Sequence, residues 1–586
     1  MIFRLTPSIA LGLLFLSLPV LAIATENGFG SAFPVPPNYL PLVAVNGPQR
    51  TIVITVRFTD QGNTTSLSQI QTLLSNLDNY YNEDSYGSVS FQTSTTPAVS
   101  SPWYTLPSLM TYYGADTVSS DNQLVADSLQ AAYNAGVDLS AYKFAIVVHA
   151  GNDEAMSHLT SDIHSFTIPG YVFNPAPLIS YKISTSVVAE SDPTGVYCHE
   201  SGHLLGLPDL YDLTGRIDPS NNFLGYWEIM ALGEWNPNNG NPLQPRPGTY
   251  PSHHSIWSKL QLGFVPNSKM ITVQPGQSAN ITLENLESRT SGDQAVKIPI
   301  AANPDGSLTY YLLEMRAKIG AYDQYLPFPS DYPGAGILIY KVNESIPAGQ
   351  GNVRLIDAHP GGDLSDAPFG PCNSPCVSNN TFWDQGNFVK IIVTTTTPAA
   401  YSVLVDRTSA PPFLLQINSP SQGVQITIDG ANLTSDSTSQ VRVPVHYGPH
   451  LVLIQSQIPV SLGSMAVQIG LTDSFASWND GNTANPRWVS VVKDTVLSAS
   501  YRLIIEPSFA TAVTAAAILG IVVLAATIHR RRRTINVNTA VTTVQGTGPG
   551  PTLPQPAGAV SPNGSFPRND SLPGVPINRD NKSDSA

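Results

Sequence analysis

The segment from Val196 to Asp212, VYCHESGHLLGLPDLYD, contains residues whose types and spacing could bind a metal ion and support hydrolysis. On an α-helix, His199 and His203 are one turn apart and face the same way, so their imidazoles can converge on one Zn²⁺. Glu200 sits beside them, where its carboxylate could accept a proton from a zinc-activated water. The histidines could also be ordinary packed residues, because an HExxH pattern alone has only three fixed positions.

The pattern continues beyond the second histidine. Gly206 can take the backbone conformation that ends a helix, which would carry Asp209 back toward the metal as a third ligand. Downstream, GYWEIMALGEW contains Met230, placed to form the turn beneath such a site. Two acids of this segment, Glu228 and Glu234, stay open as alternative third ligands, because some zinc sites take a distant Glu. We therefore expect a zinc site with the ligands His199, His203 and Asp209 and with Glu200 as general base and acid.

The N-terminus has the pattern of a secretory signal. MIFRLTPSIALGLLFLSLPVLAIA contains one cation, then an apolar run, and ends in small residues. We expect residues 1–24 to be removed, although a retained N-terminal anchor is the alternative. Residues 25–50 are then a linker or a short pro-segment.

An uncharged stretch near the other end predicts a membrane span. Residues 507–528 are long and apolar enough to cross a bilayer as one helix. The four arginines from Arg530 to Arg533 follow directly, and clustered arginines favour the cytoplasmic side. Residues 529–586 are expected to be a basic stop-transfer segment and a disordered cytoplasmic tail. We therefore expect a single-pass cell-membrane protein whose catalytic domain is extracellular.

The composition excludes one class of partner and suits the exterior of a cell. The net charge is −14, so no basic face is available to neutralise nucleic-acid phosphates. Cys372 and Cys376, in PCNSPC, could close a small disulfide in an oxidising environment, whereas Cys198 is expected in the core. Five Asn-x-Ser/Thr triplets could make the chain a glycoprotein, at Asn63, Asn280, Asn343, Asn379 and Asn432.

The pattern of apolar residues favours an α+β fold. Thr51–Phe58 and Tyr142–Gly151 are typical of buried strands, and the segment LSQIQTLLSNLDNYYNEDSYG between them has helical spacing. This order predicts a mixed sheet flanked by helices, which would carry the active-site helix. Short strands dominate from about Gln294 onward, so we expect one catalytic domain at residues 51–408 with a β-rich C-terminal part.

A second, smaller domain is expected before the membrane span. Pro411 and Pro412 mark a boundary, and residues 413–505 contain alternating runs such as VQITIDG and HLVLIQSQI. These runs predict a small all-β, sandwich-like domain.

The chain resembles the secreted immune inhibitor A-like (M6-type) zinc metallopeptidases over roughly residues 50–400. The resemblance rests on ordered blocks: LDNYYNEDSYGSVSF, VVHAGNDEA, CHESGHLLGLPDLYD, GYWEIMALGEW, HHSIWSKLQLGFV, YYLLEMRAKIGAYDQYLP, GAGILIYKV and LIDAHPGGDLSDAPF. It implies a zincin-like catalytic domain and a zinc endopeptidase that cleaves extracellular proteins. In this resemblance His199, His203 and Asp209 look like metal ligands, and Glu200 looks like the catalytic acid and base.

Other polar residues remain candidates for supporting roles. Asp153 and Glu154 in HAGNDEA could bind Ca²⁺ or line the cleft, or form a solvated turn. An oxyanion could be stabilised by one of three tyrosines, Tyr211, Tyr226 or Tyr250. Substrate contacts could come from three histidines, His253, His254 and His359. The alternative to an enzyme is a catalytically inactive adhesion or scaffold protein of the cell envelope, built on a zincin domain.

Overall fold

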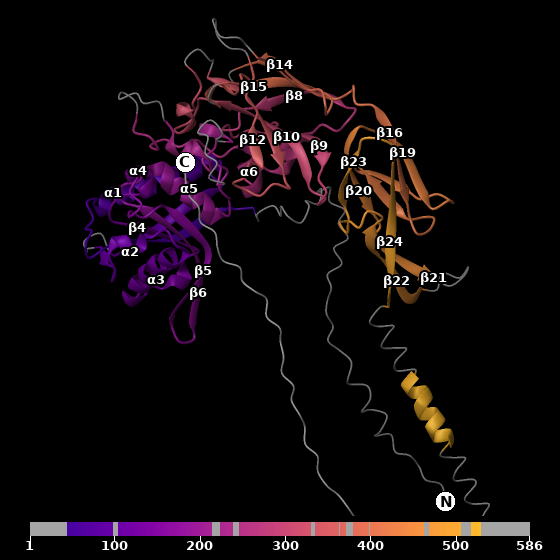
Figure 1. Cartoon of the computed structure of the whole chain (residues 1–586), viewed down its shortest axis with the longest axis horizontal. Coiled ribbons are helices and arrows are strands. Elements are labelled where there is room, and N and C mark those ends of the chain that lie inside the picture. The colour runs from indigo at the N-terminus through magenta and orange to yellow at the C-terminus, as the bar shows by residue number, and fades with distance from the viewer. Residues whose placement is uncertain are drawn as a thin grey trace, which may run out of the picture. The chain divides into compact units, whose positions relative to one another are not determined.

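The computed structural model describes residues 44–97, 103–213, 223–237, 245–329, 334–361, 364–370, 379–397, 399–461, 468–505 and 517–528 (Figure 1). Three expected features lie outside these residues: the signal at 1–24, the disulfide of Cys372 and Cys376, and the tail at 529–586. The contacts divide the chain into two units, residues 1–506 and residues 507–586. The candidate site belongs to the first unit.

Residues 44–213 are built on a six-stranded mixed sheet. Its strands are β1 (Gly47–Arg57), β2 (Val89–Thr96), β3 (Tyr104–Thr105), β4 (Phe144–His149), β5 (Phe166–Ala176) and β6 (Ile179–Ala189). The order is β2-β1-β4-β6-β5, and β3 pairs with β1. Strands β1, β2, β4 and β6 are parallel, whereas β5 is antiparallel to β6 and forms one edge.

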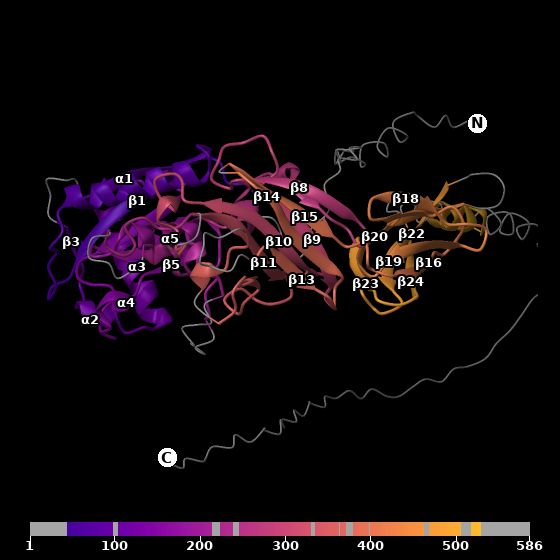
Figure 2. The ribbon, with the colours of Figure 1, turned by 90° about the horizontal axis from the view of Figure 1, so that it is seen from above.

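Helices cover both faces of this sheet (Figure 2). They are α1 (Leu67–Asp84), α2 (Met110–Tyr113), α3 (Val118–Asn134), α4 (Glu154–Ser157) and α5 (Thr194–Leu205). Because successive side chains of a strand point to opposite faces, Val53 shares a core with Leu74 of α1, whereas Ile54 shares one with Leu124 of α3. The mixed α+β class expected from the sequence is confirmed.

A β-rich part follows the helix α6 (Ile256–Leu262). One sheet has the order β12-β11-β10-β9-β7 and the other has the order β13-β14-β15-β8. Their strands are β7 (Met270–Thr272), β8 (Ser278–Glu284), β9 (Ala295–Ala302), β10 (Leu308–Ala317), β11 (Ala335–Asn343), β12 (Val353–Leu355), β13 (Thr381–Asp384), β14 (Val389–Thr396) and β15 (Ala400–Asp406). Short 3₁₀ helices connect the elements: η2 (Leu139–Ala141), η4 (Gly225–Trp227), η5 (Leu232–Trp235), η6 (Asn267–Lys269), η7 (Asp323–Tyr325) and η8 (Leu364–Asp366).

The strands from Pro412 to Ile505 form two further sheets, with the orders β19-β16-β24-β22-β21 and β18-β17-β20-β23. These strands are β16 (Pro412–Asn418), β17 (Gln425–Ile428), β18 (Ala431–Thr434), β19 (Gln440–His446), β20 (Gly448–Ile454), β21 (Gln457–Ser461), β22 (Gln468–Trp478), β23 (Arg487–Val491) and β24 (Thr495–Ile505). One apolar core, which includes Leu415, Ile426 and Trp478, lies between them. The domain limits drawn from the sequence, 51–408 and 413–505, stay predictions.

The expected membrane span is only partly described. Residues 517–528 are helical, whereas residues 507–516 lie outside the described part of the chain. Within the described residues, none of the helices is both long enough and apolar enough to cross a membrane. The span at 507–528 therefore stays a prediction.

A buried ion network joins α1, α6 and the β-rich part. The Nζ atom of Lys259, on α6, lies 3.1 Å from a carboxylate oxygen of Asp84 and 3.1 Å from one of Glu287. Asp84 also lies 2.7 Å from Nδ1 of His254, and Glu287 contacts Nδ1 of His253. These side chains are almost completely buried, so each charge depends on its partners for stabilisation.

Candidate metal centre

Two glycines shape the end of α5 and the turn after it. Gly206 has a φ of 105°, in the left-handed region, and the amides of Gly206 and Leu207 donate to the carbonyls of His203 and Gly202. This closes the helix and turns the chain back over its last turn. A Cβ on Gly202 would lie 2.5 Å from the sulfur of Met230, so a larger residue there would displace the Met230 side chain. The segment around Met230 thus packs directly against the helix that carries the histidines.

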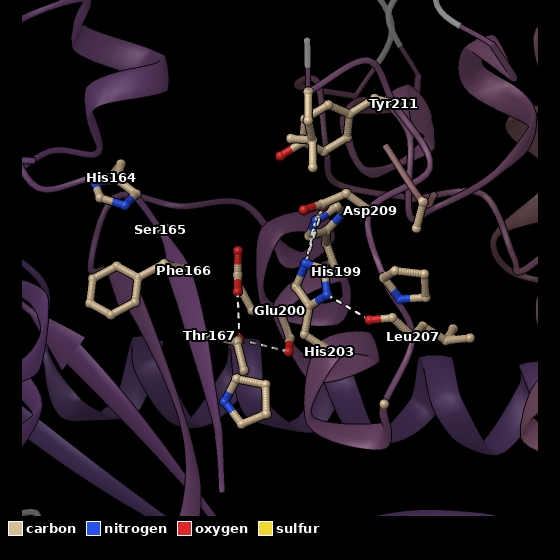
Figure 3. A pocket seen from close by; sticks show the side chains of 15 residues that line it. His164, Ser165, Phe166, Thr167, His199, Glu200, His203, Leu207, Asp209 and Tyr211 are labelled. Atoms are coloured by element: carbon tan, nitrogen blue, oxygen red, sulfur yellow. Dashed lines mark hydrogen bonds and ion pairs between the residues drawn. The ribbon is translucent and has the colours of Figure 1, made fainter. Parts of the chain in front are cut away.

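The structure brings His199, His203 and Asp209 together (Figure 3). The Nε2 atoms of the two histidines are 3.2 Å apart. The Oδ1 atom of Asp209 lies 3.1 Å from Nε2 of His199 and 3.2 Å from Nε2 of His203. Three ligands at zinc-ligand distances in a tetrahedral arrangement would be about 3.3 Å apart. The donor set and its spacing therefore fit one zinc ion.

The other ring nitrogens hold the two imidazoles in place. Nδ1 of His199 donates to the carbonyl of Ile229 at 2.9 Å, and Nδ1 of His203 donates to the carbonyl of Leu207 at 2.8 Å. In the neutral form of each ring, these bonds place the proton on Nδ1 and leave the lone pair of Nε2 available to a metal. Oε2 of Glu234 lies 3.6 Å from Nδ1 of His199, on the side of the ring away from Asp209.

The electrostatics of the centre favour a cation. Burial alone would lower the pKa of His199, but the carboxylates of Glu234, Asp209 and Glu200 raise it to about 10. Burial would raise the pKa of Asp209, but His199 and His203 hold it well below its usual range. The carboxylates therefore stabilise positive charge at the imidazoles, and a divalent ion would receive the same stabilisation.

The two alternative third ligands lie elsewhere. Glu228 is fully buried, and its carboxylate accepts from the amides of Met230 and Ser255 and from the hydroxyl of Ser258. Glu234 approaches His199 through the nitrogen that already donates to a carbonyl. Of the three acids considered from the sequence, Asp209 is the one that meets both Nε2 atoms.

Glu200 has a partner that the sequence did not indicate. The hydroxyl of Thr167, on β5, donates to Oε2 of Glu200 at 2.6 Å. Ser186 of β6 donates to the main-chain carbonyl of Glu200 at 3.1 Å and lies 2.7 Å from the Thr167 hydroxyl. A carboxylate oxygen of Glu200 lies within 4.8 Å of a nitrogen from each histidine. The edge of the sheet thus holds Glu200 beside the candidate metal centre.

A cavity of about 660 Å³ opens over these groups. The two histidines, Glu200 and Asp209 line it together with Phe166 and Thr167 of β5, Tyr211, Leu213 and Ala348. The ring of Tyr211 lies 6.2 Å from that of His199. Tyr211 is therefore the one of the three candidate tyrosines that lines this cavity.

The remaining candidates lie away from the cavity. Tyr250 stacks on Tyr325 at 4.5 Å, and the carbonyl of Tyr226 accepts from Ser252. His253 and His254 belong to the buried ion network and do not line the cavity. Nδ1 of His359 bonds to the carbonyl of Asp366. Cys198 is buried as expected, and the Tyr81 hydroxyl donates to its carbonyl.

Comparison with known proteins finds a family model that matches part of the chain. Residues 178–265 match the model of the immune inhibitor A peptidase M6 catalytic domain. Residues 178–265 are thus similar to the catalytic domain of the immune inhibitor A (M6) metallopeptidases. The match covers α5, Asp209, Met230 and α6, so every candidate ligand and Glu200 lie within it.

Two relatives align with parts of the chain. Immune inhibitor A of Bacillus thuringiensis subsp. alesti is 29% identical over 202 residues, covering 27% of this chain and 28% of that protein. The pre-pro-metalloprotease PrtV of Vibrio cholerae serotype O1 is 42% identical over 76 residues, covering 13% of this chain and 7% of that protein. The aligned parts are thus a small share of either relative. Among solved structures, OgpA of Akkermansia muciniphila has 12% identity and a TM-score of 0.25, covering 57% of this chain and 95% of that one.

Proposed function

We propose that this chain is a zinc-dependent endopeptidase that hydrolyses peptide bonds of extracellular proteins. The observation that carries the proposal is the convergence of Asp209 Oδ1 with both Nε2 atoms at 3.1–3.2 Å, beside an acid held by Thr167. The match of residues 178–265 to a metallopeptidase catalytic domain supports the same reaction class.

His199, His203 and Asp209 would hold the zinc. When bound, zinc would polarise the scissile carbonyl and make a water molecule more acidic. Glu200 would take the proton from the attacking water and deliver it to the leaving amine. Because Thr167 occupies Oε2, the other carboxylate oxygen of Glu200 is available for this transfer. The hydroxyl of Tyr211 is the candidate for a bond to the developing oxyanion.

The edge strand β5 offers a place for the substrate chain. It pairs with β6 on one side, and among the described strands it has no partner on the other. An extended peptide could add to such an edge through main-chain hydrogen bonds. Phe166 and Thr167 lie at the start of β5 and line the cavity, so a peptide added there would pass beside Glu200.

Removal of metal from the full-length chain is expected to abolish casein hydrolysis, because no ion would then polarise the carbonyl. Treatment with a chelator should reduce hydrolysis to the background rate, and stoichiometric Zn²⁺ should restore it. Hydrolysis that survives complete removal of zinc would contradict the proposed mechanism. A zinc-loaded chain that cleaves none of a panel of denatured proteins would favour the inactive scaffold.

Replacing Thr167 by Val is expected to lower kcat by about tenfold with little change in KM, because the Glu200 carboxylate loses the bond that orients it. Thr167→Ser, which keeps a hydroxyl, should retain most of the activity. Zinc content should be unchanged in both variants. Equal kcat for wild type and Thr167→Val would show that this bond does not orient Glu200 for catalysis.

We also propose that the catalytic domain is held at the outer face of the cell membrane by residues 507–528. The support is in the sequence: an uncharged stretch of this length followed by four arginines. Trypsin added to intact cells should then digest the catalytic domain and leave the C-terminal tail protected. A full-length chain that resists trypsin until the cells are lysed would contradict this topology.

A further inference from the structure

A second group of metal-ligand side chains lies at the rim of the catalytic cavity. It comprises Asp116, Glu154 and His164, and one donor atom from each lies within 4.8 Å of the others. Nδ1 of His164 is 3.1 Å from Oδ1 of Asp116. His164 also lines the cavity, on the side formed by the segment that leads into β5 and apart from Asp209 (Figure 3). We call these three residues the rim cluster.

The rim cluster is assembled from three separate segments that are fixed against one another. Asp116 precedes α3, Glu154 is the first residue of α4, and His164 precedes β5. The amide of Glu154 donates to the carbonyl of Ile163. Gly114 lies so close to the segment before His164 that a Cβ there would be 2.5 Å from the carbonyl oxygen of Ser161. The backbone therefore holds the three segments, and with them the three ligand side chains, close to one another.

The neighbours of the rim cluster are also anchored beneath it. The carboxylate of Asp153 caps α4 at Ala155 and accepts from both the amide and the hydroxyl of Ser165. The Ser165 hydroxyl also lies 2.9 Å from Asp192. Asp153 is adjacent to Glu154, and Ser165 is adjacent to His164. Partly buried hydrogen bonds thus set the positions from which these two side chains reach the rim.

Within the described part of the chain, no lysine or arginine forms an ion pair with the rim cluster. Among the described ion pairs, Asp116 pairs with His164 only, and Glu154 has none with Lys or Arg. Burial and the neighbouring Asp116 raise the pKa of Glu154. Burial also raises the pKa of the nearby Asp121. Asp116 adds to this rise, whereas His164 lowers the pKa. Two carboxylates and one imidazole thus converge at this point, a set of donors that suits a cation.

We propose that Asp116, Glu154 and His164 bind a second divalent metal ion of the zinc or manganese type. An imidazole with carboxylates suits these ions, whereas Ca²⁺ prefers a set of oxygen ligands alone. The site is separate from the one formed by His199, His203 and Asp209, and the proposal does not depend on catalysis there. A metal at the rim would tie the segment before β5 to α3 and α4, and so brace the strand that carries Thr167.

Counting bound zinc in four forms of the full-length chain tests the rim site. Each form is stripped with a chelator, loaded with Zn²⁺, freed of excess metal and measured by elemental analysis. Wild type should retain two zinc ions per chain. Asp116→Asn/Glu154→Gln should retain one, and His199→Ala/His203→Ala should also retain one. The combination of all four substitutions should retain none.

Asn is chosen at position 116 because Asp116 has a φ of 49°, a conformation that Asn tolerates well. Asp138→Asn/Glu284→Gln makes the same change of charge away from the rim and should retain two ions. Zinc should also raise the Tm of His199→Ala/His203→Ala and leave that of the combined variant unchanged. If wild type retained one zinc ion and Asp116→Asn/Glu154→Gln also retained one, the rim site would be refuted. The proposed catalytic centre would remain intact. Zero zinc in His199→Ala/His203→Ala, with a normal circular dichroism spectrum, would refute it as well.

Discussion

Replacing Glu200 by Gln is expected to lower kcat/KM by roughly 10²–10⁴-fold, the range typical of a lost general base. Gln has the size of Glu, so its side-chain carbonyl can still accept from Thr167, but its amide cannot take a proton from water. Zinc content should stay at the wild-type level, because Glu200 is not among the three groups at 3.1–3.2 Å spacing. Steady-state hydrolysis of a peptide substrate measures the loss.

A matched variant separates this effect from a general loss of negative charge. Glu284→Gln makes the same substitution on β8, outside the cavity, and should leave kcat/KM within about twofold of wild type. Glu200→Gln that kept more than a tenth of the wild-type kcat/KM would exclude Glu200 as the base, whatever the zinc content.

The replacement of Lys259 by Met is expected to lower the free energy of unfolding by about 3–5 kcal/mol, the cost of leaving buried carboxylates without their partner. Lys259 lies between Asp84 and Glu287, and its side chain is fully buried. Met fills similar space but cannot donate a hydrogen bond or carry a charge. Lys182→Met, on an exposed position of β6, is the control and should change stability by less than about 0.5 kcal/mol. Denaturant unfolding followed by tryptophan fluorescence measures both.

The stability lost with Lys259 should depend on pH. Burial would raise the pKa of Asp84, but Lys259 and His254 hold it well below its usual range. Burial would also raise the pKa of Glu287, but His253 and Lys259 lower it to about 2. Stability from groups with depressed pKa values is present above about pH 4 and is lost as the pH falls through the folded-state values. The gap between wild type and Lys259→Met should therefore shrink below pH 4, and a constant gap would show that Lys259 acts by packing alone.

The parts of the fold with strong local patterns could be predicted from the sequence. The run from Thr51 to Phe58 lies largely within β1, and the helical segment after it corresponds to α1. The end of the metal-site helix could also be predicted from the local sequence, because glycine at position 206 can adopt the left-handed conformation at low cost. Asp209 follows it closely in the chain, so the turn alone brings it back to the histidines.

The rest of the site depends on contacts between distant segments. Thr167 lies 33 residues before Glu200, in a stretch whose apolar pattern predicted no element, and it reaches Glu200 because β5 and β6 pair. Glu228 and Glu234 could not be ranked against Asp209, because sequence spacing does not tell which side of His199 an acid approaches. His253 and His254 were candidates for substrate contacts, yet charges on α1 and in the β-rich part enclose them.

The most direct test of the metal centre is an anomalous difference map at the zinc absorption edge from crystals of the zinc-loaded protein. We expect a peak about 2.0–2.2 Å from Nε2 of His199, Nε2 of His203 and a carboxylate oxygen of Asp209. Absence of a peak between these three groups, in crystals where excess Zn²⁺ was present, would contradict the account.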